Sequence, residues 1–144
     1  MSHSNNDDLM REIFLTTKTI ACVGLSPRLD RASHSIASYL KSLGYHVIAV
    51  NPATEKVIGF PELYPTLAEI PNKIELVQIF RRSENVPPIV EDAIARGAKY
   101  VWMQIGVAHG DAAARARAAG LQVVMNRCML QEHRRLFGEK FVTW

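Results

Sequence analysis

The sequence has little cysteine, few aromatic residues and only a small excess of positive charge. Of its 144 residues, two are cysteine and 8% are aromatic, and the formal net charge is +3. Cys22 and Cys128 are too few for a disulfide framework, so the cytoplasm is the expected location. The arginines are scattered rather than gathered into a basic stripe, which argues against a nucleic-acid partner.

Long apolar runs are also absent. No segment approaches the length of a membrane span, and Met1 to Asp8 is too polar for a signal peptide, so no membrane partner is expected. An apolar content of 48% and a charged content of 22% are ordinary for a globular protein, and the length fits one domain over residues 1–144.

The sequence repeats one unit, in which a short apolar run precedes an amphipathic helical stretch. The five runs are Thr19 to Val23, Val47 to Val50, Leu76 to Phe80, Tyr100 to Gln104 and Val123 to Met125. They are continuous rather than alternating, as is typical of strands buried on both faces of a parallel sheet. The predicted fold is therefore α/β, a doubly wound, mainly parallel five-stranded Rossmann-like sheet with helices on both faces.

Helices are predicted over Ser33 to Leu43 and over Val86 to Arg96, because each segment places its apolar residues on one face. Three glycines mark helix ends before a following run: Gly44, Gly97 and Gly120. Residues 1–16 contain an N-terminal helix that we expect at the edge of the sheet. Asn51 to Ile70, rich in proline, is predicted as an ordered loop with a short helix near Leu67.

The segment from Ile20 to Ser35, IACVGLSPRLDRASHS, is the most informative part of the chain. An apolar run ends at Gly24, and a loop with two arginines leads to a helix-start signal at Ser33. The first N–H groups of a helix have no intrahelical partner, and the helix dipole favours an anion there. This arrangement predicts a phosphate-binding turn.

In doubly wound folds, ligands bind beyond the carboxyl ends of the strands, so the residues after each run are the candidates. The candidate binding residues are Gly24, Leu25, Ser26, Pro27, Arg28, Arg31, Ser33, His34, Asn51, Pro52, Phe80, Arg81, Arg82, Gln104, Ile105 and Gly106. This set contains no carboxylate pair, no Ser/His/Asp arrangement and no cluster of metal ligands. We therefore predict no catalytic and no metal-binding residue.

Two common nucleotide sites do not fit the sequence. The first loop has one glycine where a dinucleotide fold would show G-x-G-x-x-G, and Asn51-Pro52 stands where NAD would require an acidic residue. The G-x-x-x-x-G-K-S/T pattern of a P-loop is missing as well. Another adenine nucleotide is the better hypothesis.

An ordered set of segments makes the hypothesis specific: VGLSPRLDRASHS, VIAVNP, VQIFRRSE, VWMQIGV, AARARAAGLQVVMNRCM and EHRRL. This set resembles the small stand-alone coenzyme A-binding proteins, which are similar to the N-terminal domain of the succinyl-CoA synthetase α subunit. The resemblance covers Thr17 to Leu136 and implies that the ligand is coenzyme A or an acyl-CoA.

In that picture Gly24 to Arg28 and the helix at Ser33 hold the pyrophosphate, while Asn51 and Pro52 line the adenosine side. Phe80 to Arg82 and Gln104 to Val107 complete the cleft. Gln78 and Asn126 depart from the resemblance, since this family often has aspartate at both positions.

The resemblance leaves two functions open. The protein either binds its ligand without catalysis, or it is the nucleotide-binding half of an acyl-transferring or ligase enzyme. In the second case it acts with a partner chain or through the Cys128 thiol, which Arg127 would activate. A homo-oligomer is compatible with both. Several residues also have simpler structural explanations: His34 as a helix cap, Gln104 as an amide bonded to the backbone, and Cys128 as a buried core residue.

Overall fold

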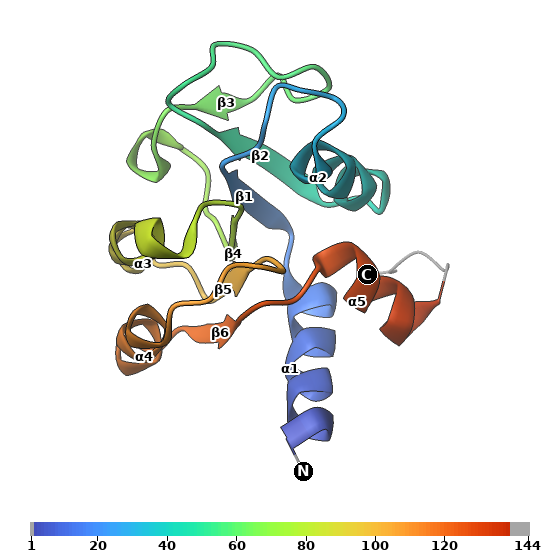
Figure 1. Ribbon diagram of the computed structural model, residues 1–144, viewed down its shortest axis with the longest axis vertical. Helices are drawn as coiled ribbons and strands as arrows, with labels where there is room; N and C mark the ends of the chain where they lie inside the picture. Colours follow the sequence, from blue (N-terminus) through green and yellow to red (C-terminus); the bar gives the residue numbers. More distant parts are fainter. Residues whose placement is uncertain (1, 139–144) are drawn as a thin grey trace.

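The computed structural model describes residues 2–138, in which six parallel strands form one sheet (Figure 1). The strands are β1 (Thr19–Val23), β2 (His46–Val50), β3 (Leu63–Tyr64), β4 (Leu76–Ile79), β5 (Tyr100–Met103) and β6 (Gln122–Val124). Their spatial order is β3-β2-β1-β4-β5-β6, so the strand order reverses between β1 and β4. This topology confirms the predicted doubly wound α/β fold.

The sheet has one strand more than predicted. β3 lies within the proline-rich loop and has only two residues, which pair with the end of β2 through the bonds from Ala49 N to Glu62 O and from Asn51 N to Tyr64 O. A two-residue strand is too short to form an apolar run, so periodicity does not reveal it. The short helix expected near Leu67 is present as the 3₁₀ turn η1 (Leu67–Glu69).

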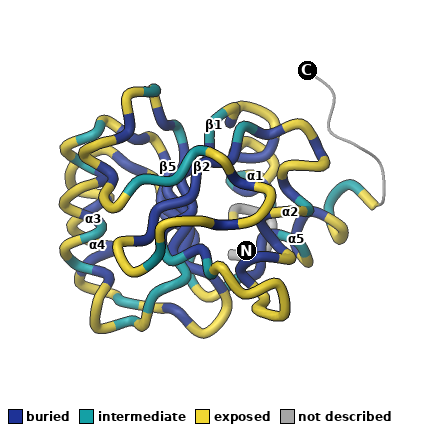
Figure 2. The backbone as a smooth tube through the Cα atoms, turned by 90° about the horizontal axis from the view of Figure 1, so that it is seen from above, coloured by how far each residue is buried: buried dark blue, intermediate teal, exposed yellow. Residues whose placement is uncertain are grey.

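Two groups of helices cover the sheet. α3 (Val86–Ala95), which follows the 3₁₀ turn η2 (Ser83–Asn85), and α4 (Gly110–Ala118) lie on one face. α1 (Ser2–Thr16), α2 (Ala32–Ser42) and α5 (Met129–Phe137) lie on the other face (Figure 1). Figure 2 shows the buried strands between these two layers. The three glycines predicted to end helices all have positive φ angles, namely Gly44, Gly97 and Gly120.

The N-terminal helix lies over a face of the sheet, and the expectation that it packs at the sheet edge is wrong. Met10, Ile13 and Phe14 are buried in the core, and the Phe14 ring lies 5.6 Å from the ring of Trp102 in β5. Fully burying a large apolar side chain contributes about 1.5–3 kcal/mol, so these residues favour a position over the sheet.

Helix α5 has no counterpart among the predicted elements. Its apolar residues Met129, Leu130, Leu136 and Phe137 recur at helical spacing and pack on the core, so the sequence carried a signal for this helix that the prediction did not use. Two polar residues, Glu132 and His133, are buried beside them. Glu132 is bonded to Arg135 of the same helix, and Arg135 also reaches Asp7 of α1 at 2.6 Å. Polar contacts therefore help to hold α5 against α1.

Candidate functional site

The chain turns sharply at Gly24, directly after β1. Its φ is +91°, and its N–H donates to Val50 O over 2.8 Å, which extends the pairing of β1 with β2. A methyl group at this position would lie 3.2 Å from both Phe80 O and Arg81 Nε. The turn therefore requires glycine for its backbone conformation and for the close approach of the chain after β4.

The loop after Gly24 folds back on the first turn of α2. Ser26 N donates to Ser33 Oγ over 3.1 Å, and Ser26 Oγ accepts from Arg28 N over 3.1 Å. The helix begins at Ala32 with Arg31 as its N-cap, and no side chain caps it. The predicted start at Ser33 is therefore corrected by one residue: Ser33 lies inside the first turn, and its hydroxyl accepts from the loop instead of capping the helix.

A cavity of about 370 Å³ lies at this helix start. It is lined by Gly24, Ser26, Pro27, Arg28, Arg31, Ala32, Ser33 and Phe80, so most of the predicted phosphate turn comes together here. The uncapped N–H groups of the first turn and two arginines give it positive potential. Arg28 is paired with Asp30 at 2.9 Å, whereas Arg31 makes no ion pair within residues 2–138. We refer to this cavity as the α2 cavity.

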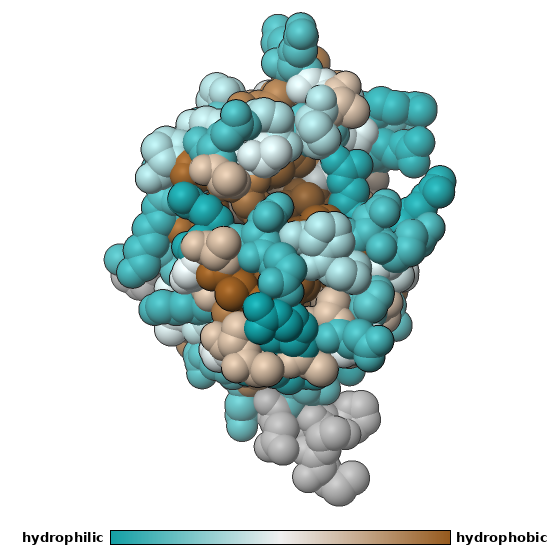
Figure 3. Space-filling view, turned by 90° about the vertical axis from the view of Figure 1, so that its left-hand side faces the viewer, coloured by the Kyte–Doolittle hydropathy of each residue, from teal (hydrophilic) through white to brown (hydrophobic). Residues whose placement is uncertain are grey.

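A second cavity, of about 320 Å³, opens between the end of β2, η1 and α3, and we refer to it as the α3 cavity. Figure 3 shows apolar side chains at the bottom of a hollow on this side of the molecule. The lining consists of Val23, Val50, Pro52, Ala53, Pro65, Thr66, Leu67, Arg81, Asn85, Ile89 and Asp92. Its mainly apolar wall has the size and character that suit a planar base.

Sequence reasoning missed the far wall of the α3 cavity. Pro65, Thr66 and Leu67 follow β3, and Asn85, Ile89 and Asp92 come from η2 and α3. The missed strand explains the first group, because Pro65 directly follows a strand that was not predicted. For the second group the sequence offers no signal, since helix residues come to the cavity only through packing.

Asn51, predicted on the adenosine side, is buried and holds two loops together. Its Nδ2 donates to Leu25 O over 3.0 Å, and its Oδ1 accepts from Ala53 N over 2.9 Å. Leu25 is itself fully buried in the core. Pro52 lines the α3 cavity, whereas Asn51 does not. Asn51 instead fixes the position of the loop that carries Pro52.

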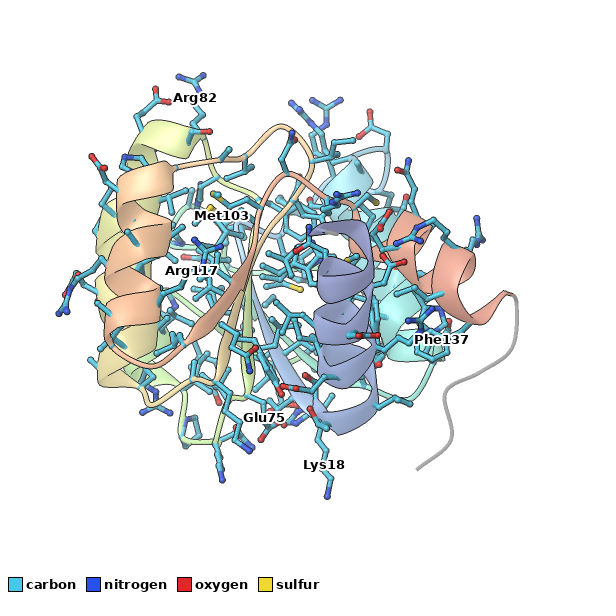
Figure 4. The ribbon with its side chains drawn as sticks, turned by 90° about the horizontal axis from the view of Figure 1, so that it is seen from below. Lys18, Glu75, Arg82, Met103, Arg117 and Phe137 are labelled. Atoms are coloured by element: carbon cyan, nitrogen blue, oxygen red, sulfur yellow. The ribbon has the colours of Figure 1, made fainter. Side chains whose placement is uncertain are left out.

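The two arginines after β4 lie differently. Arg81 packs over Gly24 and lines the α3 cavity, which places its guanidinium between the two cavities. Arg82 is exposed, and Figure 4 shows its side chain at the periphery of the molecule, on the opposite side from Lys18 and Glu75. The structure therefore brings Arg81, but not Arg82, to the candidate site.

His34 is turned away from the α2 cavity. Its Nε2 donates to Ile58 O over 2.8 Å, and its ring meets the Phe60 ring edge-on at 5.4 Å. The Lys41 ammonium donates to Gly59 O in the same turn. His34 and Lys41 thus attach the turn Val57–Phe60 to α2, and His34 is placed as a structural residue.

The loop after β5 joins the loop before α5. Gly106 N donates to Asn126 Oδ1 over 2.7 Å, and Asn126 N donates to Val107 O over 3.1 Å. Asn126 has a φ of +58°, a conformation that asparagine tolerates better than most residues. Ile105 is 60% exposed and Gln104 is 3% exposed, so only Gln104 packs into the molecule.

The sequence neighbours of Cys128 do not form a catalytic set with it. Cys128 is buried as the N-cap residue of α5, Glu132 pairs with Arg135, and His133 Nδ1 bonds to Tyr39 Oη at 2.7 Å. Over the described part of the chain, no three His, Cys, Asp or Glu side chains gather in a group that could hold a metal ion.

Residues 18–134 match the family of CoA binding domains. The chain belongs to this family. An uncharacterized Bacillus subtilis protein, YneT, is 35% identical over 124 residues, covering 86% of this chain and 91% of YneT. The solved structure of Prb, a protein redesigned for binding, is 44% identical and superimposes with a TM-score of 0.89 over 93% of this chain and 94% of Prb.

An ADP-forming acetate–CoA ligase of Archaeoglobus fulgidus is 33% identical over 75 residues, which are 52% of this chain and only 11% of the ligase. The resemblance predicted from the sequence segments is thus confirmed at the level of the family and of a CoA-binding type of domain. No helix among residues 2–138 is long and apolar enough to cross a membrane.

Proposed function

We propose that this protein binds coenzyme A or an acyl-CoA across its two cavities and catalyses no reaction on its own. The observation that carries the proposal is the position of Gly24 and Arg81. Gly24 lines the α2 cavity, Arg81 packs over Gly24, and Arg81 also lines the α3 cavity. One ligand with phosphates at one end and a base at the other therefore spans both.

The chemistry of each cavity fits one part of coenzyme A. The uncapped first turn of α2, with Arg31 beside it, suits the pyrophosphate. The apolar wall of Val50, Pro52 and Leu67 suits the adenine ring. Arg81 supplies a cation between them for the additional ribose phosphate. NAD fits less well, because β2 is followed by Asn51 and Pro52 rather than by an acidic residue for the ribose hydroxyls.

The proposal includes a cytoplasmic location, in line with the two cysteines, both of which are free thiols in the structure. An enzyme partner that takes up the bound ligand is compatible with the proposal, since the A. fulgidus ligase is far longer than the stretch it shares with this chain.

Ligand-linked unfolding tests the proposal. A ligand that binds only the native state adds about 2.7 kcal/mol to the free energy of unfolding at one hundred times its dissociation constant. We expect this gain for coenzyme A and a much smaller one for NAD at the same concentration, measured by urea unfolding. A larger gain with NAD would contradict the proposal.

Catalysis is tested separately by incubating the purified protein with acetyl-CoA and following the release of free thiol. We expect no release above the rate in buffer, for the native protein and for Cys128→Ser alike. A rate that disappears in Cys128→Ser would instead support an enzyme with a thiol nucleophile.

A further inference from the structure

A chain of buried amides crosses the sheet beneath the α2 cavity. Gln104, at the end of β5, accepts two hydrogen bonds at Oε1, from Met129 N over 2.9 Å and from Gln78 Nε2 over 3.1 Å. A backbone N–H can only donate, so the bond from Met129 fixes which end of the Gln104 carboxamide points inward. The oxygen faces the interior, and the nitrogen faces the other way.

The rest of the chain agrees with this orientation. Because Gln78 donates to Gln104, the oxygen of Gln78 must face Cys22, whose Sγ lies 2.9 Å from it. Burial raises the pKa of the Cys22 thiol, so the thiol keeps its proton and donates to that oxygen. Each of the two hydrogen bonds that link Cys22 to Gln78 and Gln78 to Gln104 therefore has one donor and one acceptor.

This arrangement leaves the Nε2 amide group of Gln104 without a hydrogen-bond partner among residues 2–138, although the residue is only 3% exposed. The fully enclosed polar side-chain atoms without a partner in this part of the chain are Thr17 Oγ1, Arg96 Nε and His133 Nε2. Gln104 Nε2 is not among them, so this nitrogen is not fully enclosed. It is a donor held in one direction by its buried oxygen.

Gln104 lies at the end of the strand next to one that contributes to the α2 cavity, although it does not itself line that cavity. Gln78 of β4 is in register with Trp102 of β5, so the residues two positions further along, Phe80 and Gln104, fall on the same face of neighbouring strands. The bond from Gln104 N to Ile79 O continues this pairing. Phe80 lines the α2 cavity. Gln104 thus lies one strand beyond Phe80, on the side away from the α3 cavity.

We propose that Gln104 donates its free N–H to a carbonyl oxygen of the bound ligand and so positions the arm that extends from the pyrophosphate away from the adenosine. This inference rests on the proposed function. A neutral donor in a largely buried place suits a neutral acceptor, and the phosphates already have the cationic α2 cavity. Coenzyme A offers the amide carbonyls of its pantetheine arm, and an acyl-CoA adds the thioester carbonyl.

The substitution Gln104→Glu separates the two ends of this side chain. The new carboxylate still accepts the bonds from Met129 and Gln78, but it presents an acceptor where the amide presents a donor. Calorimetric titration with 3′,5′-ADP, coenzyme A and acetyl-CoA compares ligands without the arm, with the arm and with the arm plus a thioester. Gln131→Glu, at an exposed position of α5, is the control for the added charge.

We expect Gln104→Glu to weaken coenzyme A at least tenfold and 3′,5′-ADP less than twofold, with Gln131→Glu near the native values for both. Equal losses for coenzyme A and acetyl-CoA assign the donor to the amide carbonyls, and a larger loss for acetyl-CoA adds a contact with the thioester carbonyl. Unchanged binding of both, or an equal loss for 3′,5′-ADP, would overturn the inference.

Gln104→Met provides a neutral second variant with the same expected selectivity, and thermal melting of each variant checks that it folds. If the native protein binds 3′,5′-ADP and coenzyme A equally well but Gln104→Glu changes neither, only the role of Gln104 is lost. If the native protein binds neither ligand, the proposed function itself fails.

Discussion

Because Gly24 has no side chain, Arg81 can pack against it and lie between the two cavities. Replacing it with alanine forces a left-handed backbone on a residue with a Cβ, at about 1–2 kcal/mol, and pushes the new methyl group against Phe80 O and Arg81 Nε. Phe80 O belongs to the backbone and yields little, so the strain falls on Arg81.

We predict that Gly24→Ala lowers the free energy of unfolding by about 1 kcal/mol more than Gly59→Ala, as measured by urea unfolding. Gly59 is a matched control, since its φ is +86° and a Cβ there meets nothing within 4 Å. Gly24→Ala should also weaken coenzyme A, while Gly59→Ala should not. Equal effects of the two variants would show that the contact with Arg81 is unimportant.

The arginine pair after β4 makes a second prediction at the scale of single residues. We expect Arg81→Ala to weaken coenzyme A tenfold or more, and more than it weakens dephospho-coenzyme A, because a charge-assisted bond to the ribose phosphate is worth about 1.5–3 kcal/mol. Arg82→Ala should change neither affinity, and Arg28→Ala should reduce both alike. Isothermal titration of the three variants measures these differences. A ligand-specific loss in Arg82→Ala rather than in Arg81→Ala would reverse the assignment.

At the scale of elements, α2 has two roles. Its first turn lines the α2 cavity, and one side of the helix holds the turn Val57–Phe60 in place. His34 belongs to that first turn, yet its ring bonds to Ile58 O. One side of the turn faces the α2 cavity while the other holds a neighbouring segment in place. His34, although adjacent in sequence to Ser33 of the α2 cavity, therefore contacts a neighbouring segment instead.

We predict that His34→Ala lowers stability by about 1 kcal/mol through the lost bond and ring contact, and leaves the affinity for coenzyme A within about threefold of native. Hydrogen exchange should speed up at residues 57–60. A loss of coenzyme A affinity above tenfold, with unchanged hydrogen exchange at residues 57–60, would show that His34 contacts the ligand instead.

At the scale of the whole molecule, α1, α2 and α5 meet around one histidine. His133 is fully buried, Tyr39 Oη bonds to its Nδ1 over 2.7 Å, and the rings of Phe14 and Phe137 lie 5.1 Å from its own. The nearby charges pair with one another: Arg135 of α5 with Asp7 of α1 and with Glu132. Arg134 lies over the Tyr39 ring. No described carboxylate pairs with the imidazole.

Burial lowers the pKa of His133 below its ordinary value of 6.5. The unfolded chain therefore takes up this proton more readily than the native protein. The contribution of neutral His133 to the free energy of unfolding is fully present above pH 6.5. It is lost as the pH falls from there through the pKa of His133 in the folded protein. The slope is at most about 1.4 kcal/mol per pH unit.

We predict that His133→Phe flattens the pH dependence of the free energy of unfolding below pH 6.5, relative to the native protein. Urea unfolding at several pH values between about 5 and 8 measures both curves. Parallel curves would show that His133 does not set the acid sensitivity of this helix layer.

The sequence by itself determined the alternation of strands and helices, the polar turn between β1 and α2 and the family. These features depend on local chemistry: continuous apolar runs for buried parallel strands, glycines where helices end, and a polar turn before a helix. Each of these signals lies within one segment of the chain, so it can be recognised in the sequence before the fold is known. β3 was not predicted because two residues are too few to show a period. α5 was not predicted although its apolar residues recur at helical spacing, so its period was present in the sequence and was overlooked.

Only the tertiary structure decided which side chains face the cavities. Arg81 and Arg82 are neighbours in sequence and both polar, but packing over Gly24 brings one inward and leaves the other outside. Asn85, Ile89 and Asp92 come to the α3 cavity because α3 packs beside η1. The outward donor of Gln104 depends on Met129 and Gln78, each about 25 residues away along the chain. The direction in which a side chain points is set by contacts between segments that are distant in the sequence. Local sequence patterns carry no information about such contacts.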